Sequence, residues 1–252
     1  MISLIIPFMN SNPARLASFY FLLAWARLMY KNIGEIIVVE QNGETKMPDF
    51  VRRIAVTDAC PLMLKAKCVN AGAKAAKYDL LLINDSDTLL KPENIPESLD
   101  EKTMVIPLIA QRALTKDETL AVLAMNPKEV DFAALALQGK RRFGGSPGGA
   151  QLISKALFKK SGGLDEGYVG HNGQDYDFEA SVKAAGGAVR YPKDHFAVGI
   201  HLWHPIDQRG TYVEKNKQQA AARIANALKL KVKSAPDLEG FEAAVKTLAK
   251  GN

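Results

Sequence analysis

One stretch of this chain constrains its fold most: residues 80–90, LLLINDSDTLL, in which an apolar run leads directly into two carboxylates. The run from Leu80 to Ile83 does not alternate with polar residues, so it predicts a strand buried on both faces, as in the middle of a parallel sheet. Asp85 and Asp87 then lie at the carboxyl end of that strand, where open α/β sheets bind ligands. Two carboxylates so close repel each other, which is tolerated in solvent or around a divalent cation. An acidic turn that only ends the strand is the alternative, and the motif alone does not decide between them.

The residues before this stretch predict alternating strands and helices. Apolar β-branched runs indicate strands, and apolar residues at helical spacing after Asn12 and Pro13 indicate a helix. This order is that of a nucleotide-binding α/β half-domain. No Gly-x-Gly-x-x-Gly follows the first strand and no Gly-Lys-Ser/Thr occurs, so dinucleotide and P-loop binding lose their main support. The expected strands are Ile2 to Pro7, Glu35 to Glu40 and Val51 to Val56, and the expected helices are Ala14 to Tyr30 and Leu62 to Lys77.

The second half of the chain has a more mixed pattern. Residues 142–149, RFGGSPGG, are rich in glycine and proline, which predicts no regular structure there. A basic tail follows, with one helix from Tyr212 to about Leu230 and a second from Leu238. The remaining expectations are strands at Thr103 to Leu108, Glu118 to Met125, Gln151 to Ser154 and Val189 to Tyr191, helical turns at Ala156 to Ser161, and an apolar run from His195 to His204.

Composition restricts the class of protein. At 252 residues, with 47% apolar and 24% charged residues, the chain is long enough for one large globular α/β domain with a tail. The longest other apolar stretch, Phe19 to Met29, is interrupted by Arg27 and is too short to span a bilayer. No signal peptide is evident, and Cys60 and Cys68 suit neither a disulfide framework nor a zinc knuckle, which predicts a soluble, cytoplasmic protein with reduced thiols.

The positive charge is concentrated near the carboxyl end. The net charge is +6, and from Val213 to Asn252 eight Lys or Arg stand against four Asp or Glu, a balance of +4. The rest of the chain is therefore nearly neutral, which argues against a nucleic-acid partner, because that function needs a basic face on the main fold. A basic helical tail is usually a solvated face, and association with an anionic surface is the alternative.

Five stretches in the right order resemble the GT-A-fold glycosyltransferases, most closely the β-1,4-galactosyltransferase-like family 7 and related bacterial family 2 enzymes. The resemblance covers residues 2–210 and implies a Rossmann-like, mostly parallel sheet flanked by helices. It divides this domain into a nucleotide-binding half, 1–91, and an acceptor half, 92–210, with the tail at 211–252. Beside the DSD segment, the stretches are IPFMN at 6–10, VVEQNG at 38–43, LKAKCVNAG at 64–72 and the segment 148–182.

The resemblance implies a nucleotide-sugar donor, for which we expect a UDP-sugar, and a set of residues that bind it. Lys65 is expected to face the diphosphate, and Asp85 to hold the ribose or a metal-bound water. Glu40 ends a strand, where a carboxylate can accept hydrogen bonds from a base or ribose, and an exposed turn acid is its alternative. The other expected donor contacts are Pro7, Phe8, Asn70, Ser86 and Gly149.

A metal site is expected around Asp87. His201 and His204 follow an apolar strand as His-x-x-His, and on their own they could be two surface histidines. In the resembled family the corresponding loop supplies metal ligands at this spacing, although the galactosyltransferases have a methionine at the position of His201. One carboxylate with two imidazoles suits Mn²⁺ better than Mg²⁺, and Mg²⁺ stays open.

The resemblance assigns proton transfer to Asp175, which corresponds to the general base of the inverting members. Helix N-terminal acids favoured by the dipole are the alternative for Asp175 and Asp177. The family has glutamate where this chain has Gln174 and a sugar-binding tryptophan where it has His171, so we expect an acceptor different from that of the animal enzymes. Asp177 and Trp203 complete the expected acceptor site.

These expectations combine into a metal-dependent inverting glycosyltransferase that extends a glycan or a lipid-linked saccharide. A sugar-phosphate nucleotidyltransferase would need a glycine-rich basic loop after the first strand, which FMNSNP at 8–13 does not supply. A non-catalytic protein that binds nucleotides or carbohydrates stays open because of Gln174 and His171.

Overall fold

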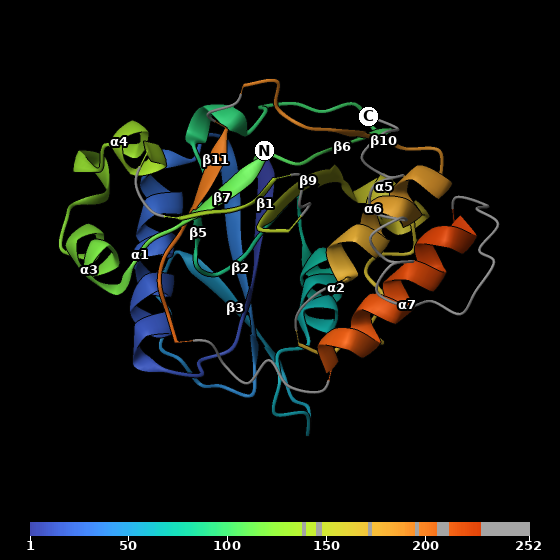
Figure 1. Ribbon diagram of the computed structural model, residues 1–252, viewed down its shortest axis with the longest axis horizontal. Coiled ribbons are helices and arrows are strands. Elements are labelled where there is room, and N and C mark those ends of the chain that lie inside the picture. Colours follow the sequence, from blue (N-terminus) through green and yellow to red (C-terminus); the bar gives the residue numbers. More distant parts are fainter. Residues whose placement is uncertain (138–139, 145–147, 171–172, 195–196, 206–211, 228–252) are drawn as a thin grey trace.

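The structure is a computed structural model that describes residues 1–137, 140–144, 148–170, 173–194, 197–205 and 212–227 (Figure 1). A seven-stranded sheet in the order β10-β6-β9-β4-β1-β2-β3 forms its centre. Neighbouring strands are parallel except where β9 pairs with β4 and β6. The strands are β1 (Ile2–Phe8), β2 (Ile33–Gln41), β3 (Val51–Val56), β4 (Leu80–Asn84), β6 (Thr103–Val105), β9 (Ala150–Ser154) and β10 (Ala188–Arg190).

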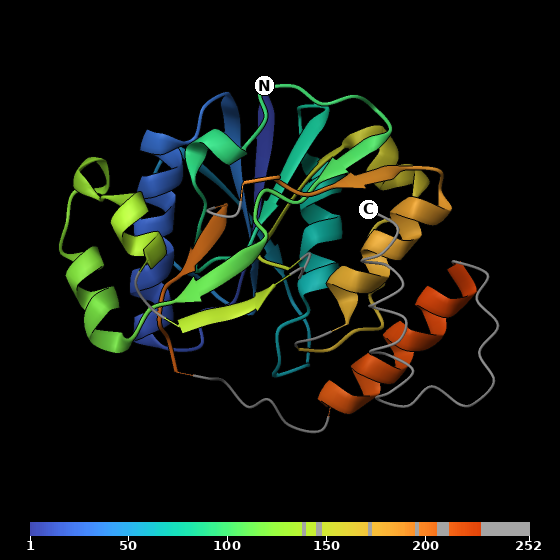
Figure 2. The same ribbon diagram turned by 45° about the horizontal axis from the view of Figure 1, so that its top comes forward.

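Helices cover both faces of this sheet. On one side lies α1 (Pro13–Met29), with α3 (Lys116–Leu123) and α4 (Phe132–Leu137) outside it (Figures 1 and 2). On the other side lie α2 (Lys65–Ala75), α5 (Lys155–Lys160) and α6 (Gln174–Ala184), with α7 (Tyr212–Ala227) outside α6. The described connections include short 3-10 helices at Pro92–Asn94 and Pro127–Glu129.

β1 shows why the sheet has two hydrophobic layers. Because side chains of a strand alternate between its faces, Leu4, Ile6 and Phe8 join the cluster that contains the apolar face of α1. Ile5 points the other way and joins the cluster that contains α2. A Cβ on Gly72 of α2 would lie 2.6 Å from Cγ2 of Ile5, so this glycine lets the helix approach the sheet closely. The core therefore fixes α1 and α2 on opposite faces of β1.

A second sheet lies beside the end of β4. It has four strands in the order β5-β11-β7-β8, which are β5 (Thr88–Leu89), β7 (Ala110–Ala113), β8 (Lys140–Gly144) and β11 (Val198–His201). β11 is antiparallel to β5, and His201 is the partner of Thr88. Chain segments from both halves of the sequence thus meet immediately after the Asp85–Asp87 turn.

The first helix of the basic tail packs on the folded body. The Arg223 Nε atom of α7 lies 2.8 Å from the Asp177 carboxylate of α6, and its Nη1 lies 3.1 Å from that of Asp165. Ala220 and Ile224 pack with Tyr168 in a small buried cluster. The described part of the tail is therefore joined to the half of the chain that contains Asp175.

Most expected elements are present, and two expectations are wrong. Residues 118–125, expected as a strand, belong mainly to α3, whose capping box joins Thr115 and Glu118. Lys140–Gly144 forms β8, so part of the glycine-rich run does have regular structure. The second tail helix, expected from Leu238, lies outside the described residues. Among the helices that are described, none has both the length and the apolarity needed to cross a membrane.

Candidate active site

The turn that carries Asp85 and Asp87 is held from inside the protein. The Asn84 amide, at the end of β4, donates to the carbonyls of Asp85 and Thr88 at 2.8 and 2.9 Å, which closes the turn. The buried Tyr30 hydroxyl donates to Asn84 Oδ1 at 3.2 Å and accepts from the Leu90 amide at 3.0 Å. Burial raises the pKa of Tyr30, so this hydroxyl remains protonated. The backbone of the turn is thus fixed by neutral hydrogen bonds.

Asp87 lies in a cluster with the two predicted histidines. Its Oδ2 atom is 3.1 Å from His204 Nε2, and its Oδ1 atom is 3.8 Å from His201 Nε2. One ligand atom from each of the three residues lies within 4.8 Å of the others. The three expected metal ligands are therefore brought together by the fold.

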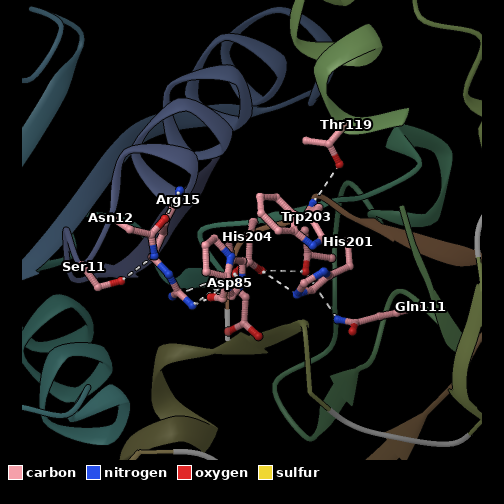
Figure 3. A network of polar contacts seen from close by, with 12 residues as sticks. Ser11, Asn12, Arg15, Asp85, Gln111, Thr119, His201, Trp203 and His204 are labelled. Carbon is pink, nitrogen blue, oxygen red and sulfur yellow. Dashed lines mark hydrogen bonds and ion pairs between the residues drawn. The ribbon is translucent and has the colours of Figure 1, made fainter. Parts of the chain in front are cut away.

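Backbone contacts place the histidine segment against the turn. The Leu202 amide donates to the carbonyl of Asp87 at 2.8 Å, and the Leu114 amide donates to that of His201 at 3.0 Å. The Trp203 amide donates to the Thr119 hydroxyl at 2.8 Å (Figure 3). His204 Nδ1 lies 2.8 Å from the Pro205 carbonyl, to which it can donate, and Nε2 faces Asp87 Oδ2 at 3.1 Å.

Arg15 is a member of this cluster that sequence reasoning missed. It lies in the first turn of α1, where its amide donates to the capping Asn12 at 2.9 Å, and its side chain reaches His204 (Figure 3). Arg15 Nη2 is 3.1 Å from His204 Nε2, and Nη1 is 3.9 Å from Asp87 Oδ2. The available signal was its place just after the loop that leaves the carboxyl end of β1, the same edge of the sheet as Asp87.

The electrostatics of Asp87 follow from these neighbours. Burial opposes ionisation of its carboxyl, but His201, His204 and Arg15 outweigh burial and hold the pKa below its usual range. Asp87 is therefore an ionised carboxylate. A carboxylate with two imidazoles fits a divalent transition cation such as Mn²⁺, and within the described part of the chain these three residues could hold it.

Asp85 belongs to a second cluster on the other side of the turn. Lys65, the first residue of α2, places its Nζ 2.8 Å from Asp85 Oδ1 and 3.0 Å from Asp175 Oδ1. Gln151 of β9 donates to the same Asp175 oxygen at 3.3 Å. Lys65 thus joins the DSD turn to Asp175, the predicted catalytic carboxylate, which lies 110 residues after Lys65 in the sequence.

The pKa values in this second cluster follow from the sharing of one ammonium. Burial opposes protonation of Lys65, but Asp175 and Asp85 outweigh it and raise the pKa of the ammonium. Burial raises the pKa of Asp85, and the attraction of Lys65 only partly offsets burial and the repulsion by Asp175 and Asp87. Lys65 is therefore a firmly charged ammonium between two carboxylates.

Several residues predicted to contact the nucleotide-sugar donor contact other protein groups in the structure. The Phe8 ring is buried and stacks on Phe19 with 3.9 Å between ring centroids, so it belongs to the core. The Glu40 side chain is fully buried, 2.6 Å from Arg53 Nε, and accepts from the Thr45 amide. It is neither an exposed turn acid nor open to a ligand, because these groups enclose it.

Asn70 also has a structural partner, the segment before α6. Its amide donates to the Leu164 carbonyl at 2.8 Å and its Oδ1 accepts from the Leu164 amide at 3.0 Å. Gly149, with φ of 99°, accepts from the Asp85 amide at 2.9 Å through its carbonyl, so it supports the turn through its backbone. Pro7 and Ser86 are buried, the former in β1 and the latter inside the turn itself.

The predicted acceptor residues are dispersed. Asp177 is buried against Arg223, and its geometry supports packing of α7 rather than an acceptor contact. Gln174 is buried beside Asp175 at the start of α6, and among the described residues no group donates to its Oε1 atom. Trp203 lies next to the histidines with Lys116 Nζ 5.8 Å from its ring centroid. His171 lies outside the described residues.

Comparison with known proteins identifies the fold. No family model and no curated protein sequence matches the chain. A Drosophila β1,4-galactosyltransferase 7 variant, solved with manganese, UDP-Gal and xylobiose, is 16% identical, with a TM-score of 0.53 over 84% of this chain and 74% of that chain. Staphylococcus aureus TarS, solved with UDP-GlcNAc, is 13% identical, with a TM-score of 0.59 over 98% of this chain and 71% of that chain.

A third solved structure agrees with these two. Glucosyl-3-phosphoglycerate synthase from Mycobacterium tuberculosis, solved with Mn²⁺, UDP and phosphoglyceric acid, is 15% identical, with a TM-score of 0.52 over 92% of this chain and 80% of that chain. Identities this low establish the fold and leave the substrate open. The expected fold is confirmed: the chain has the GT-A fold of these glycosyltransferases.

Proposed function

We propose that this protein is a metal-dependent inverting glycosyltransferase that moves a sugar from a UDP-sugar to the hydroxyl of a saccharide acceptor. One observation carries the proposal: a group of side chains suited to bind a metal ion and a candidate general base lie on either side of the same turn. Asp87 of that turn lies with His201 and His204, and Asp85 of the same turn shares Lys65 with Asp175. Proteins of the same fold that are solved with Mn²⁺ and UDP support this assignment.

Each residue has a part in the proposed reaction. A divalent cation held by Asp87, His201 and His204 would supply Lewis-acid neutralisation of the donor diphosphate. Lys65 would add a fixed positive charge beside the phosphates, because its pKa keeps it protonated. Asp175 would accept the proton of the acceptor hydroxyl as that oxygen attacks the anomeric carbon from the face opposite the diphosphate.

The direct test is a panel of nucleotide-sugars incubated with the protein, Mn²⁺ and candidate saccharide acceptors. We expect release of nucleoside diphosphate and a product whose anomeric configuration, read by NMR, is opposite to that of the donor. Retention of configuration would contradict the inverting mechanism. Donor binding without turnover across the panel would favour the non-catalytic alternative.

Asp175→Asn tests the proposed base. The amide keeps the size of the side chain but cannot take a proton, so we expect the transfer rate to fall by at least about a hundredfold while the donor still binds. Asp49→Asn, an exposed acid in a turn away from the site, is the matched control and should keep wild-type turnover. Normal turnover by Asp175→Asn would remove this residue from the role.

A further inference from the structure

The Arg15 side chain lies against two of the three residues of the metal site proposed above. Its side chain comes from α1 and converges with His204 on the Asp85–Asp87 turn (Figure 3). The guanidinium Nη2 lies 3.1 Å from His204 Nε2 and 3.3 Å from Nδ1, and Nη1 lies 3.9 Å from Asp87 Oδ2. Arg15 is 8% exposed, so its charge is largely removed from water and faces two of the three candidate ligands.

These contacts and a metal ion oppose each other. Arg15 Nη2 lies at nearly the same distance from both ring nitrogens of His204, so the guanidinium sits over the imidazole, beside the Nε2 atom that faces Asp87 and that a cation would need. Arginine does not lose its proton in proteins, so it cannot leave the site as a neutral group. A divalent cation bound next to this guanidinium would also be repelled by it, strongly so in a buried setting.

We propose that Arg15 is an internal counter-ion that competes with the divalent cation for Asp87 and His204, and that the donor diphosphate resolves this competition by binding the guanidinium. The proposal rests on the proposed function, because it takes the metal and the diphosphate from there. Arginine is suited to both states, since its planar fork pairs with carboxylate and with phosphate oxygens. In this scheme the empty site is held together by Arg15, and metal binds well only when a diphosphate is present.

The side chain of Arg15 can be changed without removing the start of α1. The helix cap uses the Arg15 backbone amide, which donates to Asn12, and not the guanidinium. Methionine has a similar length and a similar helix propensity. Arg15→Met therefore removes the charge and the hydrogen bonds from the cluster while it keeps the local fold.

The experiment measures two affinities separately: Mn²⁺ binding without nucleotide, by the EPR signal of free Mn²⁺, and UDP binding without metal, by calorimetry. In Arg15→Met we expect Mn²⁺ to bind about tenfold more tightly and UDP about tenfold more weakly, within the usual range of coupling between sites. Arg15→Lys keeps the charge without the fork, and we expect an intermediate Mn²⁺ affinity. Arg27→Met, an exposed arginine on the same helix, is the control and should change neither.

The opposite signs separate this proposal from general damage, which would weaken both ligands. Circular dichroism of each variant shows whether α1 and the sheet remain folded, and Arg15→Lys carries the test if Arg15→Met does not fold. If wild-type protein binds both ligands but a folded Arg15 variant binds Mn²⁺ equally or more weakly, Arg15 does not compete with the cation. That result overturns this inference and leaves the proposed function standing. Wild-type protein that binds neither Mn²⁺ nor UDP overturns the proposed function together with it.

Discussion

Asp85 and Asp87 are two residues apart, yet the fold gives them opposite surroundings. Asp87 faces two histidines and an arginine, and its pKa is lowered. Asp85 shares a single ammonium with Asp175, and its pKa is raised. The sheet explains this, because β11 and α1 approach the turn from one side and α2 and α6 from the other. Identical side chains thus acquire different chemistry from their neighbours alone.

The difference suggests separate tasks for the two carboxylates. Asp87 is ionised and lies among donor atoms, which suits a ligand of a cation. Asp85 instead holds Lys65 in place beside Asp175, which keeps positive charge between the donor side and the acceptor side of the proposed site. The clusters are joined by the backbone of the turn, which hydrogen bonds of Asn84 and Tyr30 hold in place, and by the repulsion between the two carboxylates.

We expect the largest difference between the two carboxylates in Mn²⁺ affinity. Asp87→Asn removes the only carboxylate of the candidate donor set, and we expect Mn²⁺ affinity to fall by about a thousandfold, or about 4 kcal/mol. Asp85→Asn leaves that set intact and should change Mn²⁺ affinity by less than about fivefold, or about 1 kcal/mol. Titration of both variants with Mn²⁺ measures the two effects. Equal losses would mean that the carboxylates share one site.

The second cluster can be tested through stability. Lys65→Met leaves Asp85 and Asp175 without their ammonium. Because the three side chains are only partly buried, with exposures of 11%, 31% and 18%, the free energy of unfolding should fall by about 2 kcal/mol at neutral pH. Urea unfolding measures this loss. Lys67→Met, on the same helix, removes a lysine with a 38% exposed side chain that pairs with Asp58, and should lower the free energy of unfolding far less, because an exposed ion pair is screened by solvent.

The stability lost in Lys65→Met should depend on pH, in a direction that follows from the pKa shifts of Lys65 and Asp85. In wild-type protein the pKa of Lys65 is raised, so its stabilisation is complete below the pKa of the unfolded chain and is lost as pH rises through the folded value. Without Lys65, the already raised pKa of Asp85 rises further, and the folded state gains stability as pH falls and this carboxyl takes up a proton. The difference in the free energy of unfolding between wild type and Lys65→Met should therefore become smaller toward acidic pH. A constant difference would contradict the pairing.

The smallest effect on stability is expected at Tyr30, whose hydroxyl helps to hold the turn that carries both carboxylates. Tyr30→Phe removes the hydroxyl that bridges Asn84 and Leu90, and the free energy of unfolding should fall by about 1 to 2 kcal/mol, because two buried groups lose their partner. Tyr20→Phe is the control: its hydroxyl bonds to Lys46 at an exposed site, where the change should be within about 0.5 kcal/mol. Thermal unfolding of the two variants decides whether the turn depends on this bridge.

The sequence predicted the elements with strong local patterns. The buried run before Asp85, the strand at Ile2 and the helix start at Asn12 are present as expected, because apolar periodicity and capping are encoded locally. The strand expected at 118–125 is wrong for a local reason as well. The apolar residues there read as a strand, and the Thr115 and Glu118 capping box, which favours a helix, was overlooked.

The site was predictable where a motif marked it and obscure where only tertiary contacts define it. Asp87, His201 and His204 come together as expected. Glu40 and Asn70 are enclosed by Arg53 and by Leu164, partners that no local pattern reveals. The roles of Asp175 and the acceptor residues stay predictions. Arg15 was missed because one arginine in a helix carries no signal until the fold brings it to residue 204.

The position of β11 determines when this site can exist. His204 lies 189 residues after Arg15, and β11 must insert between β5 and β7 before the histidines reach Asp87. Contacts so distant in sequence form late, because a long loop must close first. A chain emerging during synthesis can therefore pair β1 with β4 while Asp87 still lacks both histidines. We expect cation binding to be among the last properties that the folding protein acquires.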